Sequence, residues 1–173
     1  MNETHSILQR MRELVVQAGN LGTNESEDLG AIQAEIDQLV EEIDGIGDRT
    51  QFNGKTLLDG SFDGTVGDGT DDLVFQIGAN GGQQLTLNLN SMKAVDLGTT
   101  TAMDAIDVTD FATTAFDDQL AGIDEAIEAV STERSSLGAN QNRLEHTISN
   151  LDNARENLQA AESRIRDLDM AEE

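Results

Sequence analysis

The sequence predicts a mainly α-helical protein: an elongated antiparallel coiled-coil bundle in which two shorter N-terminal helices pack against one very long C-terminal helix, with a small β-hairpin region. Three observations predict this fold. Apolar residues recur every seventh position over the last third of the 173 residues, two amphipathic stretches stand near the N-terminus, and the chain has no proline to interrupt a helix. The expected segments are 1–45 (helical hairpin), 46–115 (β-hairpin and variable loops) and 116–173 (long helix).

Two amphipathic stretches predict the helical hairpin. Apolar residues from Ile7 to Ala18 recur at helical spacing, and glycines and asparagines then supply a turn. A second apolar stripe runs from Leu29 to Ile43, and we expect its helix to end at Gly45. Asn24 followed by Glu27 predicts a capping box at the start of this helix.

The heptad pattern predicts one unbroken helix from about Asp117 to Leu168. Its seam positions are Ile123, Val130, Leu137, Leu144, Leu151, Leu158 and Ile165. We predict a companion seam at Leu120, Ile127, Arg134 and the positions that follow at intervals of seven. The N-terminal helices would reach only about 25 Å along a helix of roughly 75 Å. We therefore expect the distal seam, from Leu144 onward, to lack a partner within the chain and to favour fraying or self-association.

Between the helical regions the periodicity changes. Val74–Ile77 and Leu85–Leu89 read as strands around an Asn80-Gly81-Gly82 turn, which predicts a β-hairpin. The Gly- and Asp-rich stretch Asp59–Asp72 predicts a mobile surface loop. Within it, Gly67–Leu73 resembles half of a calcium-binding nonapeptide repeat, but a single copy favours a flexible acidic turn.

Composition excludes several classes of function. Ten Lys and Arg oppose 34 Asp and Glu, a net charge of −24 that repels phosphate backbones and anionic lipid. We expect no nucleic-acid partner and no membrane partner. The absence of cysteine removes disulfides and thiolate chemistry. His5 and His146 lie in different blocks without metal-ligand spacing, and no catalytic constellation emerges, so we predict no enzyme, no cofactor and no metal site.

Two blocks of the sequence carry a family resemblance. Leu8–Gln17 (LQRMRELVVQ), Ala31–Asp44 (AIQAEIDQLVEEID) and Thr50–Gly60 (TQFNGKTLLDG) resemble the N-terminal conserved region of bacterial flagellins. Ser131–Asp167 resembles the flagellin C-terminal conserved region. FQIGAN at Phe75–Asn80 is similar to the short flagellins of Gram-positive bacilli. The resemblance covers roughly two thirds of the chain and implies a secreted, extracellular filament subunit that supports motility.

The resemblance also implies partners: other flagellin subunits, export and assembly chaperones, and Toll-like receptor 5, which would read the monomer. The positions that match the receptor-binding residues of the family are Gln9, Arg10, Glu13, Leu14, Gln17 and Glu35. From spacing, Gln9, Arg10, Glu13 and Gln17 share one face of the first helix. By spacing alone this face would be an ordinary solvated surface, and only the resemblance makes it a recognition site.

The sequence departs from the family at both ends. The stretches that precede and follow the matched blocks in flagellins, which line the filament channel as a coiled coil, are absent here, so we expect the central rod core. An alternative function follows: a flagellin-derived binding module or receptor agonist that does not itself polymerise. Electron microscopy under salting-out conditions would separate the two functions.

Overall fold

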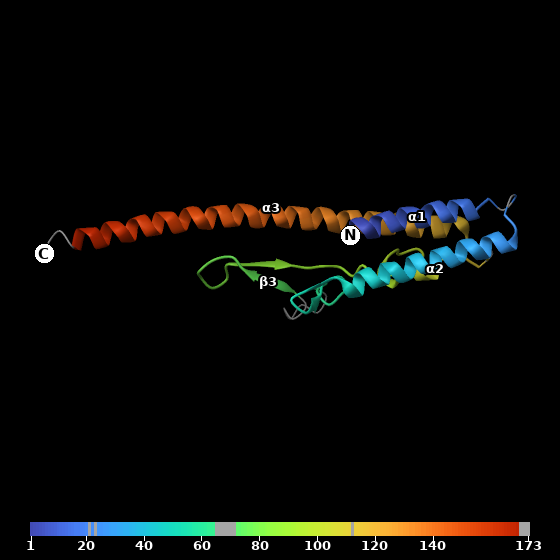
Figure 1. The fold of residues 1–173 in the computed structure, drawn as a ribbon, viewed down its shortest axis with the longest axis horizontal. Helices are drawn as coiled ribbons and strands as arrows, with labels where there is room; N and C mark the ends of the chain where they lie inside the picture. The colour runs from blue at the N-terminus through green and yellow to red at the C-terminus, as the bar shows by residue number, and fades with distance from the viewer. Residues whose placement is uncertain (21, 23, 65–71, 112, 170–173) are drawn as a thin grey trace. The chain divides into compact units, whose positions relative to one another are not determined.

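The computed structural model describes residues 1–173 except 21, 23, 65–71, 112 and 170–173. The chain divides into two compact units. The first unit comprises Met1–Leu73 and Leu87–Ser135, and the second comprises Val74–Thr86 and Ser136–Glu173. The long C-terminal helix contributes to both. Figure 1 shows the elements coloured by residue number from blue at the N-terminus to red at the C-terminus.

The two N-terminal helices confirm the predicted helical hairpin, with corrected ends. Helix α1 spans Asn2–Ala18 and helix α2 spans Ser26–Arg49. The predicted Asn24 capping box is wrong by one residue, because Glu25 is the N-cap and forms the box with Asp28. The Asn24 side chain instead donates to the Gln17 carbonyl at 2.7 Å, at the C-terminal end of α1.

The predicted end of α2 at Gly45 is also wrong. The helix continues through Gly45 and Gly47 to Arg49, and Thr50 closes it by donating both its amide and its hydroxyl to the Ile46 carbonyl. A single glycine weakens a helix by only about 1 kcal/mol, which buried neighbours such as Ile43 can offset.

Helix α3, Phe116–Asp169, is continuous, as the heptad pattern predicted. In the first unit it runs antiparallel to α1 (Figure 1). The predicted companion seam is shifted by one residue. Ala126 and Glu133 are buried at 0% and 5% exposure, whereas Ile127 is half-buried and Arg134 is exposed. The first half of α3 therefore packs along two positions of the heptad, as in a coiled coil. Glu133 places a buried carboxylate at the second of these positions.

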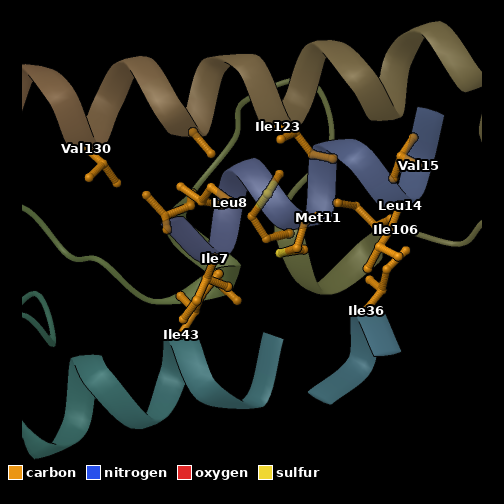
Figure 2. Packing of buried hydrophobic residues seen from close by; sticks show 14 of the residues in the cluster. Ile7, Leu8, Met11, Leu14, Val15, Ile36, Ile43, Ile106, Ile123 and Val130 are labelled. Atoms are coloured by element: carbon orange, nitrogen blue, oxygen red, sulfur yellow. The ribbon is translucent and has the colours of Figure 1, made fainter. Parts of the chain in front are cut away.

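The core of the first unit lies where α1 is packed between α2 and α3 (Figure 2). Leu8, Met11 and Val15 of α1 are fully buried. Ile43 of α2 and Ile123 of α3 face this layer from opposite sides and are also fully buried. Aliphatic side chains (Leu, Ile, Val, Met and Ala) thus make up the buried cluster, as the low aromatic content requires.

The segment that precedes α3 contributes to the same core, which the sequence did not reveal. It contains two short 3-10 turns, η1 (Ala94–Asp96) and η2 (Met103–Ala105). Its buried apolar residues are Ala94, Leu97, Met103, Ile106 and Val108. Side chains satisfy much of its backbone: Gln33 donates to the Ile106 carbonyl at 3.0 Å and accepts from the Val108 amide at 2.9 Å.

Two small hairpins complete the fold. Strands β3 (Leu73–Gln76) and β4 (Gln84–Leu87) pair around a turn at Gly81 and Gly82, which confirms the predicted β-hairpin with slightly shifted ends. A second hairpin joins β1 (Gln51–Phe52) and β2 (Lys55–Thr56).

The sequence analysis missed the β1–β2 hairpin although its signal is visible. Asn53 and Gly54 connect the strands and both have positive φ, at 51° and 77°. This is the geometry that an Asn-Gly pair favours in a two-residue turn.

The predicted loop Asp59–Asp72 is only partly described. Residues 65–71, with most of the candidate calcium turn, lie outside the described residues. Phe62 is 8% exposed and forms a bridge with Leu89, so the beginning of this stretch is packed against the chain. At Phe62 the stretch is therefore buried and not at the surface as predicted, next to the buried Leu58.

Candidate functional site

The six residues that the resemblance places in a recognition site occupy α1 and α2. Arg10 joins the two helices: its Nε and Nη2 donate to Glu35 Oε1 at 2.8 and 2.7 Å. Its Nη1 also lies 3.3 Å from Glu13. The hydrogen bonds to Glu35 raise the pKa of the Arg10 guanidinium above its ordinary value, with a smaller contribution from Glu13. The structure therefore brings Arg10, Glu13 and Glu35 together in one exposed charged cluster.

Two further residues extend this surface. Gln9 and Gln17 are exposed on α1, and Gln9 hydrogen-bonds His5 one turn earlier at 3.1 Å. We call the exposed set Gln9, Arg10, Glu13, Gln17 and Glu35 the α1–α2 ridge. About half of the Arg10 and Glu35 side chains is exposed, 48% and 45%, so the ion pair stays accessible from solvent.

Leu14 does not belong to the exposed part of this surface. It is 2% exposed and packs in the core, where it supports the ridge from beneath. Leu14 therefore lies behind the exposed positions that the resemblance names with it. The reason lies in helical periodicity, since Leu14 shares the inward stripe with Ile7, Met11 and Ala18.

Two contacts that the sequence analysis missed attach α3 to the rest of the first unit. Arg12 donates to Asp124 at 2.7 Å and ties α1 to α3. Glu125 accepts four hydrogen bonds, from the amides and hydroxyls of Thr99 and Thr100, at 2.6 to 2.9 Å. Those bonds, led by the Thr99 and Thr100 hydroxyls, lower the pKa of Glu125 to about 2. Neither contact has a local sequence signal, because the partners are far apart in the chain.

The heptad seam of α3 changes character along its length. Ile123 and Val130 are fully buried, and Leu137 and Leu144 are half-buried. Beyond them, Leu151, Leu158 and Ile165 are 44%, 71% and 74% exposed, and Ile148 on the neighbouring row is 58% exposed. We call Ile148, Leu151, Leu158 and Ile165 the distal stripe. The predicted exposure of these four residues is confirmed, whereas Leu144 is partly covered.

Metal-ligand clusters and membrane-spanning helices were sought among the described residues. Within the described part of the chain, no three His, Cys, Asp or Glu residues are placed to hold a metal ion. Among the same residues, no helix combines the length and apolar character needed to cross a bilayer.

The two conserved blocks match family models. Residues 1–63 match the bacterial flagellin N-terminal helical region, and residues 120–173 match the bacterial flagellin C-terminal helical region. The crystal structure of Bacillus cereus flagellin superimposes with a TM-score of 0.67 at 33% identity, covering 86% of this chain and 78% of that one. The chain belongs to the flagellin family.

Curated flagellins extend the match over the whole chain. Flagellin of Bacillus subtilis (strain 168) is 53% identical over 192 residues, and the flagellar filament 33 kDa core protein of Treponema phagedenis is 43% identical over 181 residues. Both alignments cover 100% of this chain but only 63% and 61% of the relatives. This flagellin-family chain thus spans less than two thirds of the length of these curated relatives.

Proposed function

We propose that this protein is a structural subunit of the bacterial flagellar filament, secreted to the cell exterior, where the filament supports motility. One observation carries the proposal: both terminal helical regions of the flagellin family are present in order in one chain, and the long helix of the second region is unbroken. The relative from Treponema phagedenis is itself named as a flagellar filament core protein.

The distal stripe supports an assembling role. A Leu or Ile side chain left in water forgoes about 1.5–3 kcal/mol relative to a buried one, so a row of them drives association. Leu151, Leu158 and Ile165 are spaced by seven residues, which suits pairing with another helix. We propose that other flagellin subunits cover this stripe, and that export and assembly chaperones act before the subunits meet.

Electron microscopy tests assembly directly. Under salting-out conditions the chain should form tubes or filaments, and the Leu158→Asn/Ile165→Asn variant should form none because it removes two apolar side chains of the stripe. Phe52→Asn is a matched control, since Phe52 is 72% exposed but lies on β1. A wild-type chain that stays dispersed would instead support the alternative, a flagellin-derived binding module that does not polymerise.

We also propose that the α1–α2 ridge is read by Toll-like receptor 5 on the monomer. The ridge offers an exposed guanidinium and two carboxylates at fixed spacing, and arginines of this kind are frequent energetic anchors of protein interfaces. Leu14 contributes by holding α1 against the core rather than by contact.

Arg10→Ala should weaken receptor binding about tenfold or more without unfolding α1, because interface arginines dominate binding energy. Arg49→Ala is the control: Arg49 also pairs with a glutamate of α2, Glu42, at 2.7 Å, but lies at the other end of that helix. Surface plasmon resonance on purified monomers measures both. Equal affinity of the Arg10 variant and the wild type would refute the assignment.

A further inference from the structure

Two asparagines of the chain are followed directly by glycine, Asn53 and Asn80. Both are exposed, and each lies in the segment that connects the strands of one of the two small hairpins. A glycine after an asparagine has no side chain to shield its amide nitrogen, so this nitrogen can approach the amide carbon of the asparagine side chain. An Asn-Gly pair therefore carries its own nucleophile and its own electrophile.

The peptide between Asn53 and Gly54 is not held by other groups. Among the described residues, the Asn53 carbonyl accepts no hydrogen bond, the Gly54 amide donates none, and the Asn53 side chain has no partner. A Cβ built on Gly54 would meet no atom within 4 Å, so the space around this residue is open. The pairing of Phe52 with Lys55 holds the strands on either side. The turn peptide can therefore rotate while the strands stay in place.

The matching peptide in the β3–β4 hairpin is restrained. The Asn80 amide donates to Gln83 Oε1 at 3.0 Å. The Asn80 carbonyl accepts from Gln76 Nε2 at 3.1 Å and from the Gln83 amide at 3.3 Å. Rotation of the peptide between Asn80 and Gly81 would break both bonds to this carbonyl, and each bond stabilises the hairpin. The two Asn-Gly pairs are thus alike in chemistry and differ in how firmly the fold holds them.

We propose that Asn53 is a site of spontaneous modification, at which the asparagine of the folded protein converts into aspartate and isoaspartate. The Gly54 amide nitrogen attacks the side-chain carbonyl carbon, Cγ. The new N–Cγ bond forms and the Cγ–Nδ2 bond breaks, so the proton of the Gly54 amide leaves with the ammonia that is released. Water then opens the resulting cyclic imide. The sequence of steps consumes one water, releases one ammonia and requires no oxidant or reductant.

Opening of the imide gives two products. Water that breaks the bond between Gly54 N and Cγ leaves aspartate, which keeps the length of the main chain and tolerates the left-handed turn conformation. Water that breaks the bond between Gly54 N and the main-chain carbonyl carbon leaves isoaspartate, in which the chain continues through Cγ. This product adds one carbon to the main chain, so the tight turn between Phe52 and Lys55 cannot keep its geometry. Neither step depends on the filament role.

Peptide mapping by mass spectrometry tests the proposal on the full chain, kept folded in a mildly alkaline buffer. We expect Asn53 to convert several-fold faster than Asn80. In concentrated urea the hairpins are lost, and the two sites should then convert at similar rates. Equal rates in the folded chain, or faster conversion of Asn80, would overturn the proposal. A difference that urea leaves unchanged would also overturn it, because the restraint by the hairpins would then have no effect.

Matched glycine substitutions test the nucleophile. Gly54→Ala adds a methyl group that shields the amide nitrogen and disfavours the observed φ of 77°, so conversion of Asn53 should slow several-fold while Asn80 is unaffected. Gly81→Ala is the control and should slow Asn80 alone. Should Gly54→Ala disrupt its hairpin, Gln76→Ala tests the restraint from the other side and should speed conversion of Asn80. Undiminished conversion of Asn53 in Gly54→Ala, or an unchanged rate at Asn80 in Gln76→Ala, would contradict the proposal.

Discussion

Two glycines of α3 meet different surroundings. A Cβ on Gly122 would clash with the carbonyl oxygen and side chain of Thr101, because the loop that carries Thr101 packs directly on the helix. A Cβ on Gly138 would meet nothing within 4 Å. Gly122 is therefore required for the close approach of loop and helix, whereas Gly138 only weakens α3.

The pair gives opposite predictions for one substitution. Gly138→Ala should stabilise the protein by about 0.5–1 kcal/mol, since alanine favours the helix. Gly122→Ala should destabilise it by about 1–3 kcal/mol, since the clash forces the loop outward. Denaturant unfolding measures both, and a Gly122→Ala variant more stable than wild type would contradict the described packing.

The lowered pKa of Glu125 predicts that the stability of the folded protein depends on pH. Its pKa is lowered to about 2 from 4.5. The ionised carboxylate is therefore more favoured over the protonated form in the folded state than in the unfolded state. This contribution is complete above the ordinary pKa and is lost as pH falls toward 2. Glu125→Gln should therefore lower the thermal midpoint at pH 7, and the difference from wild type should shrink below about pH 4.5. A difference that grows on acidification would show that the Thr99 and Thr100 bonds do not favour the carboxylate.

At the scale of the element, α3 is one helix with two environments. Its first part packs against α1 with Ile123 and Val130 fully buried, while Leu158 and Ile165 are mostly exposed. The apolar residue at every seventh position continues through both parts. We therefore expect tertiary packing, the usual source of helix stability, to make the first part more stable than the distal part.

Matched alanine substitutions on the seam measure this difference. Ile123→Ala should cost about 2–5 kcal/mol, because it leaves a cavity in a fully buried site. Ile165→Ala, at the same heptad position of the same helix, should change the stability of the monomer by less than about 0.5 kcal/mol. Equal losses at the two positions, measured by denaturant unfolding at low protein concentration, would show that the distal stripe is covered within the chain.

The extent of sequence-based prediction also differs between elements. The helices and the β3–β4 hairpin were predictable because their signals, periodicity and turn residues, are local. The segment that carries Leu97, Met103 and Val108 was not, because irregular backbone has no period and its burial depends on distant side chains such as Gln33 and Asp44. The companion seam was misplaced because apolar Leu120 and Ile127 outweighed the buried Ala126 and Glu133 in the pattern.

The same contrast holds for the candidate sites. Helical spacing placed Gln9, Arg10, Glu13 and Gln17 on one face, but only the resemblance added Glu35, which α2 supplies across the hairpin. Spacing could also have excluded Leu14 from the surface.

At the scale of the whole molecule, the division into two compact units follows from where apolar burial ends along α3. The core cluster draws on α1, α2, the segment before α3 and the first turns of α3, and its last buried apolar residue on α3 is Val130. Beyond Ser135, α3 contributes to the second unit with the β3–β4 hairpin. The uneven burial along α3 supports the proposed filament role, because it leaves the distal stripe available to another helix.

Amide hydrogen exchange along α3, measured at low and high protein concentration, tests this account most directly. In dilute solution the amides near Ile123 and Val130 should exchange slowly and those near Leu158 and Ile165 quickly. At high concentration the distal amides should become protected as subunits cover the distal stripe. Uniform slow exchange along α3 in dilute solution would contradict the account.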